Sequence, residues 1–600
     1  MRPPALPQHQ GRALRLLWAV APGQLLAVLL CTCGMALLPA AGVAVTGWSV
    51  QFLADAARTG GRADGLLGPV LGIASVIVLT QLLGVARGYL EALLRTRLSD
   101  AVQERLLDKA LALELGHFED PDVYDRLQRA TRESMSRPYQ VFTDLVATAS
   151  GAVTLFSVAA LLAAWSWPAA LLVLAGALPL AVAQGVHDKA RWRVEHARAP
   201  DRRRLAYLEH LITHDRAYKE TRLLGLGELF RRRFLDIVHG FYHTDRRLER
   251  RHAIVSALLA VAGSAAVAAA VLLVLAPAAQ SGQVGRFAAY VTSLVLVQAA
   301  ARAFFESLGR LHDDGRYLGD VFAFLDIPEP ARPRATAAFP ERLTEGIEFR
   351  DVSFRYPGSA EPVLDGFSLF VPAGRCMALV GPNGAGKTTI VKLLARFYEP
   401  DAGVILIDGV PITRFDRAEL RDRLAVVFQD FLEYEAPAAE NIGFGRVDRL
   451  DDRTRLRRAA RRAGAAFLDE LPRGLDTMLG RWFEGGRQLS GGQWQKVALA
   501  RAFFRQAPIT VLDEPTAAID PAAEAEIFGR MADMAGGGTT LLIAHRFATV
   551  RAAADLIAVL DRGRVVESGT HEALMARSGM YARLFRLQAA GYQDSSPAAR

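Results

Sequence analysis

The longest uncharged segment of the chain places the strongest constraint on its fold. No Asp, Glu, Lys or Arg occurs between Leu16 and Gln51. A helix needs roughly 20 apolar residues to cross a bilayer, whereas the apolar part of a cleaved signal peptide has only about 7–15. Arg12 and Arg15 precede the run, and basic residues favour the cytoplasmic side of a membrane. We therefore expect a membrane-spanning helix with a cytoplasmic N-terminus.

Five further apolar stretches follow the first one along the chain. They run near Leu66–Val85, Val141–Trp165, Pro168–Val186, Ala253–Ala276 and Val284–Ala301. With the N-terminus inside, the connections outside the membrane are short, and the two inside connections, Arg95–Arg137 and His187–Arg251, are long and charged. The second of these contains 17 Lys and Arg residues. Loop length and charge bias together predict six membrane spans.

The overall charge of the protein is explained by this topology. The formal net charge is +8, but the basic residues concentrate between apolar runs, so we expect no nucleic acid among the partners. Hydrophobic residues make up 51% of the chain and charged residues 22%, which excludes a long disordered chain. The three cysteines are too few for a disulfide framework or a four-cysteine zinc site.

The two inside connections are too long to be simple loops. We expect each span to continue as a helix into the cytosol, turn, and return. His117–Tyr124, with Pro121 as a helix breaker, is the first predicted turn, and Thr213–Gly227 is the second. These turns are expected to rest on a cytosolic domain. A helical hairpin on the surface, without a partner domain, fits the same pattern.

The second half of the chain has the pattern of an α/β domain. Prolines at 328, 330 and 333 mark a linker, and short β-type runs alternate with helical ones from Gly346 onward. The buried-strand run Met377–Val380 leads directly into Gly-Pro-Asn-Gly-Ala-Gly-Lys-Thr-Thr at 381–389 and then into a helical stretch. This is a phosphate-binding loop in its strand–loop–helix context. Lys387 would reach the β- and γ-phosphates, and Thr388 would ligate Mg²⁺.

A second buried-strand run, Ile509–Leu512, ends in two carboxylates. Asp513 suits a role beside Mg²⁺, and Glu514 can polarise the attacking water as a general base. An acidic pair after a strand is weak evidence by itself. Together with the phosphate loop, the pair predicts a site that hydrolyses Mg·ATP.

The sequence Leu-Ser-Gly-Gly-Gln at 489–493 lies between these two motifs. With it, the second half resembles the nucleotide-binding domain of ATP-binding cassette (ABC) transporters over roughly residues 346–587. The resemblance implies that Tyr356 stacks on adenine, Gln429 senses Mg²⁺, Asp520 occupies the D-loop, and His545 is the switch histidine. It also implies that the 490–493 segment closes over the γ-phosphate of another subunit's ATP, so a dimer is expected.

The predicted site can be stated residue by residue. The catalytic residues are Glu514 and His545, and the metal-binding residues are Thr388, Gln429 and Asp513. The nucleotide-binding residues are Tyr356, Gly381, Pro382, Asn383, Gly384, Ala385, Gly386, Lys387, Thr388, Thr389, Gln429, Ser490, Gly491, Gly492, Gln493 and Asp520. The expected cofactors are ATP and Mg²⁺.

The first half also resembles ABC transporters of the exporter type, in which six spans precede the cassette. His117–Leu127 and Ala217–Gly227 look like the coupling-helix segments, and Glu484–Gly486 looks like the loop that contacts them. The run Leu489–Arg501 is similar to the branch of bacteriocin and lantibiotic peptide exporters, although Trp494 replaces the commoner Arg or Lys.

The expected protein is multi-domain, with an all-α six-helix transmembrane domain followed by an α/β P-loop NTPase domain of the ABC type. The expected limits are 1–325 for the transmembrane domain, 326–345 for a linker, 346–590 for the cassette and 591–600 for a tail. We expect a multi-pass protein of the cytoplasmic membrane with its cassette inside, acting as a dimer with a second copy or a homologous half-transporter. The expected activity is ATP-driven export of a peptide, lipid-like or drug-like molecule.

Other functions fit parts of the sequence. Six spans argue against a soluble ABC ATPase of DNA repair or translation, and Glu514 with His545 argues against an ATP-binding receptor or channel without turnover. An importer of a siderophore-like compound and a lipid flippase use the same scaffold, and they remain the alternatives.

Overall fold

The computed structural model describes residues 6–59, 67–134, 137–281, 284–330, 334–515 and 538–593. The chain forms two compact units. The first comprises Met1–Leu113 and Pro121–Glu329, and the second comprises Glu114–Asp120 and Pro330–Arg600. The short segment Glu114–Asp120 therefore belongs to the second unit, although the first unit precedes and follows it in the sequence.

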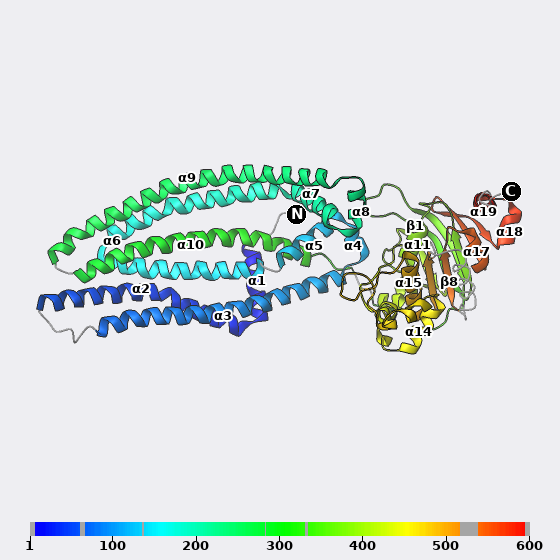
Figure 1. The fold of residues 1–600 in the computed structure, drawn as a ribbon, viewed down its shortest axis with the longest axis horizontal. Helices are drawn as coiled ribbons and strands as arrows, with labels where there is room; N and C mark the ends of the chain where they lie inside the picture. Colours follow the sequence, from blue (N-terminus) through cyan, green and yellow to red (C-terminus); the bar gives the residue numbers. More distant parts are fainter. Residues whose placement is uncertain are drawn as a thin grey trace. The chain divides into compact units, whose positions relative to one another are not determined.

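The first unit is all helical, and its longest helices run beside one another (Figure 1). They are α1 (Leu6–Val20), α2 (Pro22–Thr59), α3 (Leu67–Ala112), α5 (Pro121–Ser134), α6 (Arg137–Ala197), α7 (Ala199–Thr213), α8 (Asp215–Leu223), α9 (Gly227–Ser281) and α10 (Val284–Leu325). Within the described residues, six helical segments are long and apolar enough to cross a membrane: Pro22–Arg58, Leu67–Ala112, Tyr139–Ala164, Ser166–Glu195, Gly227–Leu273 and Val284–Leu311. The predicted six-helix domain is confirmed.

Two of the predicted spans lie in the single helix α6. The backbone of Ser166 is non-helical, with φ −156° and ψ 97°, and it separates the two spans. Pro168 follows two residues later, and proline cannot donate the backbone hydrogen bond that a continuous helix needs. The short outer loop expected at this point is therefore a break of one residue between two helical segments.

Each of the two long inside connections contains a short helix at the position of the predicted turn. The first connection contains α4 (Leu115–Glu119), and Pro121 opens α5 at the first helical position. This position suits proline because its missing N–H would have no partner there. In the second connection, α7 ends at Thr213, α8 follows, and Gly225 has φ +65° before α9 begins.

The second unit is built on two sheets flanked by helices. A four-stranded sheet has the order β2-β1-β4-β5, and a six-stranded sheet has the order β10-β9-β3-β8-β7-β6. The strands are β1 (Gly346–Phe354), β2 (Leu364–Pro372), β3 (Cys376–Val380), β4 (Ala402–Ile407), β5 (Val410–Pro411), β6 (Leu424–Val427), β7 (Ile509–Asp513), β8 (Thr539–Ile543), β9 (Leu556–Asp561) and β10 (Arg564–Gly569). Besides α4, the helices are α11 (Lys387–Leu394), α12 (Arg417–Asp422), α13 (Ala438–Gly443), α14 (Arg453–Arg462), α15 (Gly491–Arg505), α17 (Phe547–Ala553), α18 (His571–Arg577) and α19 (Met580–Gln593).

Five strands of the larger sheet, β9, β3, β8, β7 and β6, pair in parallel. Their side chains are almost all buried, as expected for a parallel sheet covered on both faces. Parallel strands end at the same edge of a sheet. The segments that follow β3, β6, β7 and β8 therefore meet there, and these segments carry the phosphate loop, Gln429, Glu514 and His545.

Candidate nucleotide site

The loop after β3 has the backbone that a phosphate cradle requires. Gly381 has φ +153°, and a Cβ at this position would lie 2.1 Å from the carbonyl oxygen of Leu560. Gly386 has φ +100° and caps the N-terminus of α11. Only glycine adopts these conformations readily and allows so close an approach. The loop leads into the N-terminal end of α11, where free N–H groups favour an anion.

Lys387 is held inside this loop. Its side chain is 7% exposed, and its Nζ donates to the carbonyl oxygens of Gly381 at 2.8 Å and Pro382 at 3.0 Å. Burial lowers the pKa of Lys387, and the nearby carboxylates of Glu514 and Asp513 oppose that shift. Thr388 is exposed at the next position, whereas Thr389 is buried. The ammonium is thus placed beside the concave loop, and the Thr388 hydroxyl can reach solvent.

Asp513 has the properties of a metal ligand. It is 1% exposed at the end of β7, and within the described residues neither carboxylate oxygen completes a hydrogen bond of normal geometry. Burial raises its pKa, and the charge of Glu514 raises it further, against the lowering effect of Thr388 and Lys387. A buried carboxylate whose charge is this poorly compensated fits a divalent cation, and oxygen ligands suit Mg²⁺.

Glu514 connects three of the strand ends. Its backbone has φ +49°, an unfavourable conformation for a non-glycine residue, and its N–H donates to the Ile543 carbonyl at 3.0 Å. One carboxylate oxygen lies 2.6 Å from His545 Nε2 after β8. The other accepts from Gln429 Nε2 after β6 at 3.0 Å. His545 and Gln429, which follow two other strands, therefore both contact the carboxylate of Glu514.

The 490–493 segment forms the start of α15. Ser490 is the N-cap, and its hydroxyl accepts from Gln493 N–H at 3.3 Å. The Gln493 side chain in turn accepts from Ser490 N–H at 2.9 Å, which completes a capping box. The side chain of Gln493 is thus engaged within its own helix, and Gly491 and Gly492 form the first helical positions. Trp494, which departs from the family pattern, is buried at 2% exposure in the core.

Tyr356 lies beside the phosphate loop. Its hydroxyl makes a hydrogen bond of 3.1 Å with Thr389 Oγ1. Its ring packs edge-on against Tyr398, with centroids 5.4 Å apart, and Lys392 Nζ lies 5.1 Å from the ring centre. In this arrangement the hydroxyl contacts the loop, and the ring is held by Tyr398 and by a cation–π contact from Lys392.

The same two residues bind α4. Lys392 Nζ lies 3.0 Å from Glu119, and the Tyr398 hydroxyl donates to the other oxygen of that carboxylate. At the start of α4, Glu114 accepts from Arg417 at 2.7 Å and from Arg421 at 2.6 Å. Burial opposes the charge of Glu114, but the two guanidinium groups outweigh it and lower its pKa. These charge-assisted hydrogen bonds explain why α4 belongs to the second unit.

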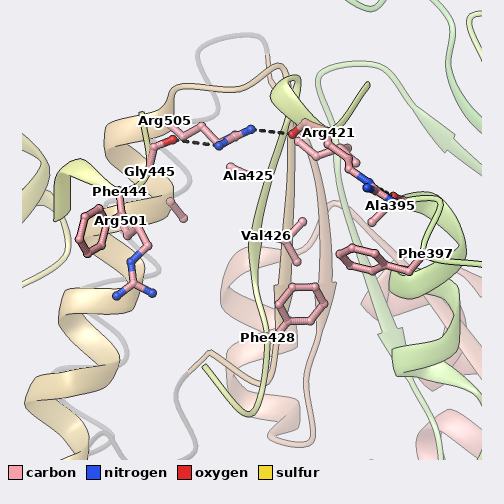
Figure 2. Close-up of a pocket in the computed structure, with 12 residues that line it drawn as sticks. Ala395, Phe397, Arg421, Ala425, Val426, Phe428, Phe444, Gly445, Arg501 and Arg505 are labelled. Atoms are coloured by element: carbon pink, nitrogen blue, oxygen red, sulfur yellow. Dashed lines mark hydrogen bonds between the residues drawn. The ribbon is translucent and has the colours of Figure 1, made fainter. Parts of the chain in front are cut away.

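A groove of about 220 Å³ lies next to the ion pair between Glu114 and Arg421. Figure 2 shows Phe397, Val426 and Phe428 in its apolar part, with Arg421 and Arg505 at one end. Arg505 donates to the carbonyl oxygens of Gly445 and Arg421 at 2.9 Å and 2.7 Å. Arg421, which binds Glu114 of α4, is therefore also part of the groove's lining.

The structure adds residues that the sequence patterns did not indicate. Gln495 donates to the backbone carbonyl of Glu514 at 3.1 Å, and Lys392 with Tyr398 joins Tyr356 to α4. Lys392 and Tyr398 lie in no recognisable motif, and Gln495 lies within the 489–501 run without an expected role of its own. Asp520, the predicted D-loop residue, lies outside the described residues.

The chain is similar in sequence to proteins of one known family. A sequence model of the family described as ABC transporter matches residues 364–517. The chain is 33% identical to the subtilin transport ATP-binding protein SpaT of Bacillus subtilis, over 80% of this chain and 78% of that protein. It is 28% identical to the nisin transport ATP-binding protein NisT of Lactococcus lactis, over 85% of each chain.

Two further similarities bear on the fold and the cargo. An ATP-dependent lipid A-core flippase of Burkholderia orbicola is 39% identical, over 54% of each chain. Among solved structures, a bacterial Atm1-family ABC exporter with ATP bound superposes with a TM-score of 0.73 at 26% identity, covering 97% of this chain and 100% of that one.

Proposed function

Because the chain belongs to the ABC transporters, with six membrane helices fused to one ATP-hydrolysing cassette as in exporters, we propose that it exports a peptide from the cytoplasm. Support for a peptide comes from the extent of the similarities. The similarity to the subtilin and nisin transport proteins extends over most of both chains, whereas that to the lipid A-core flippase covers about half. The similarity to exporters does not favour the importer alternative.

The contact of Glu514 with both Gln429 and His545 carries the proposal for hydrolysis. Glu514 accepts a proton from the attacking water, and His545 fixes the orientation of the carboxylate. Lys387 leaves its loop carbonyls to bind the β- and γ-phosphates, and Tyr356 stacks on the base. Asp513, Thr388 and Gln429 would hold Mg²⁺, which would neutralise charge on the phosphate oxygens. The remaining phosphate contacts come from the loop N–H groups at 381–389.

The working unit in this proposal is a dimer. Ser490, Gly491 and Gly492 lie at the N-terminus of α15, where free N–H groups and the helix dipole favour an anion. We assign them, with Gln493 as their capping partner, to the γ-phosphate bound by the other cassette, and Asp520 to the same interface. The second subunit is a second copy of the chain or a homologous half-transporter. The dimer lies in the cytoplasmic membrane with its cassettes inside.

Purified protein in liposomes tests the cargo assignment. ATPase activity is measured with a panel of cationic peptides, lipid A-type lipids and hydrophobic drugs. We expect peptides to stimulate hydrolysis and lipids or drugs to leave it near the basal rate. Stimulation by lipid alone would favour a flippase instead.

The ion pairs of α4 predict a specific coupling defect. Glu114→Gln removes the charge that binds Arg417 and Arg421 but keeps the side-chain shape. We expect basal ATPase activity within about two-fold of wild type, because the substitution leaves the site at Glu514 intact. Stimulation by cargo is expected to fall about five-fold or more, because coupling between two sites typically changes an affinity by at least that factor. Glu104→Gln, an exposed position on α3, serves as the matched control. Normal stimulation in Glu114→Gln would show that α4 carries no coupling.

The second inside connection suggests an occupant for the groove. Leu223 and Leu224 at the end of α8 are 84% and 64% exposed, and they form an adjacent pair of exposed apolar side chains. We assign α8 of a second copy to the groove lined by Phe397 and Phe428. Each cassette would then receive α4 from its own chain and α8 from its partner.

A charge at the tip of α8 tests this assignment. Leu223→Asp is expected to reduce cargo stimulation about five-fold or more, because a carboxylate is poorly accommodated in an apolar groove. Basal hydrolysis is expected to persist. Val566→Asp, which places the same charge at an exposed apolar residue on β10, is the control. If both variants respond to cargo like wild type, the groove has another occupant.

A further inference from the structure

The loop that carries His545 is held by a residue of the C-terminal helix. Gln588 Nε2 donates to the backbone carbonyl of His545 at 2.9 Å. Its Oε1 accepts from the backbone N–H of Phe547 at 2.7 Å. One side-chain amide thus uses its donor and its acceptor on two backbone groups that lie on either side of Arg546.

The helix that presents Gln588 is firmly attached to the cassette. Its first N–H groups, at Met580 and Tyr581, donate to Glu567 of β10. Tyr581 is fully buried, and its hydroxyl makes a 2.8 Å hydrogen bond with His571. The rings of Tyr581 and Phe585 pack against Phe547, with centroids 5.3 Å and 6.1 Å apart. The amide is therefore presented from a fixed position.

The held segment is short and lies next to the reacting group. β8 ends at Ile543 and α17 begins at Phe547, so three residues connect the two elements. The His545 imidazole must stay within hydrogen-bond reach of Glu514, from which it is 2.6 Å distant. Misplacement of a catalytic group by about 1 Å can cost about 10²-fold in rate.

We propose that Gln588 is a positioning residue for ATP hydrolysis, whose amide fixes the backbone of the His545 loop and thereby holds the imidazole against Glu514. This inference rests on the proposed function, because it requires that His545 acts in hydrolysis. It assigns a role in turnover to α19, a helix that carries none of the nucleotide-site motifs.

Substitutions at Gln588 alone and with His545 test the inference in the full-length protein. Gln588→Met keeps the length of the side chain and removes both hydrogen bonds. The loop stays attached to β8 and α17, so we expect kcat to fall about 10-fold, with the KM for ATP within about two-fold. Gln588→Glu keeps the acceptor for Phe547 N–H and is expected to lose less. Arg583→Met, an exposed position on α19, is the control and is expected to behave like wild type.

The double variant separates positioning from simple stabilisation. In a His545→Ala background, Gln588→Met is expected to cause no further loss, because the group it positions is already gone. Single-turnover hydrolysis of radiolabelled ATP resolves these slow rates, and thermal melting checks folding. An equal loss in both backgrounds, or unchanged kcat in Gln588→Met, would overturn the inference. If Gln588→Met melts at a markedly lower temperature, the comparison is made with Gln588→Glu. Full activity of His545→Ala alone would instead refute the role of His545 in the proposed function.

Discussion

Replacing Glu514 with Gln is expected to lower ATP hydrolysis by about 10²–10⁴-fold, the usual contribution of a positioned general base. The amide is nearly the same size and still contacts Gln429 and His545, but it cannot accept a proton from water. ATP binding is expected to stay within about two-fold of wild type, because Lys387 and the phosphate loop are unchanged. Phosphate release and the binding of a fluorescent ATP analogue measure the two quantities separately.

Two comparisons make the Glu514 result specific. Glu433→Gln, an exposed glutamate that follows β6, is expected to hydrolyse ATP normally. Asp513→Asn, in contrast, is expected to lose hydrolysis, because it removes the charge that we assign to Mg²⁺ binding. Near-normal turnover in Glu514→Gln would mean that another residue orients the water.

Lys387→Ala is expected to abolish measurable hydrolysis and to weaken nucleotide binding. The ammonium lies within 2.8–3.0 Å of two loop carbonyls and provides the positive charge inside the loop. Lys392, one helical turn further, is already bound to Glu119 and to the ring of Tyr356 and cannot replace it. ATP affinity is measured by fluorescence titration, and turnover by phosphate release.

The control for this prediction is a lysine of the same domain. Lys496→Ala, in the middle of α15, removes an ammonium that has no role in the proposed phosphate site. It is expected to bind and hydrolyse ATP normally. Unchanged affinity and turnover in Lys387→Ala would refute the assignment of the 381–389 loop to phosphate.

The parts of the fold that the sequence predicts correctly are those that depend on residues close together in the chain. An uncharged run such as Leu16–Gln51 has few alternatives to a membrane helix, because its backbone must satisfy its own hydrogen bonds in lipid. The 381–389 loop is equally local, since its glycines, its lysine and the flanking strand and helix are consecutive. The order of the strands comes from the structure, in which β6, β7 and β8 are parallel neighbours and bring Gln429, Glu514 and His545 together.

The parts that sequence reasoning missed depend on pairs far apart in the chain. Glu114 and Arg421 are separated by 307 positions, and Gln588 and His545 by 43. Single glutamates and glutamines occur throughout the sequence, so nothing local distinguishes these. Pro121 breaks a helix and therefore predicts the first turn at His117–Tyr124. The position of Pro121 indicates that the chain turns there. It does not indicate that Glu114, seven residues earlier, binds Arg417 and Arg421 of the cassette.

In the proposed function, turnover at Glu514 drives a peptide away from the side that holds the cassettes. In proteoliposomes, external ATP reaches only transporters whose cassettes face outward, so export appears as uptake into the lumen. We predict that wild-type protein accumulates a fluorescent cationic peptide in the lumen when ATP and Mg²⁺ are added, and that Glu514→Gln protein does not. ATP-driven release of preloaded peptide from the lumen, or equal accumulation by both proteins, would show that turnover at Glu514 does not drive export.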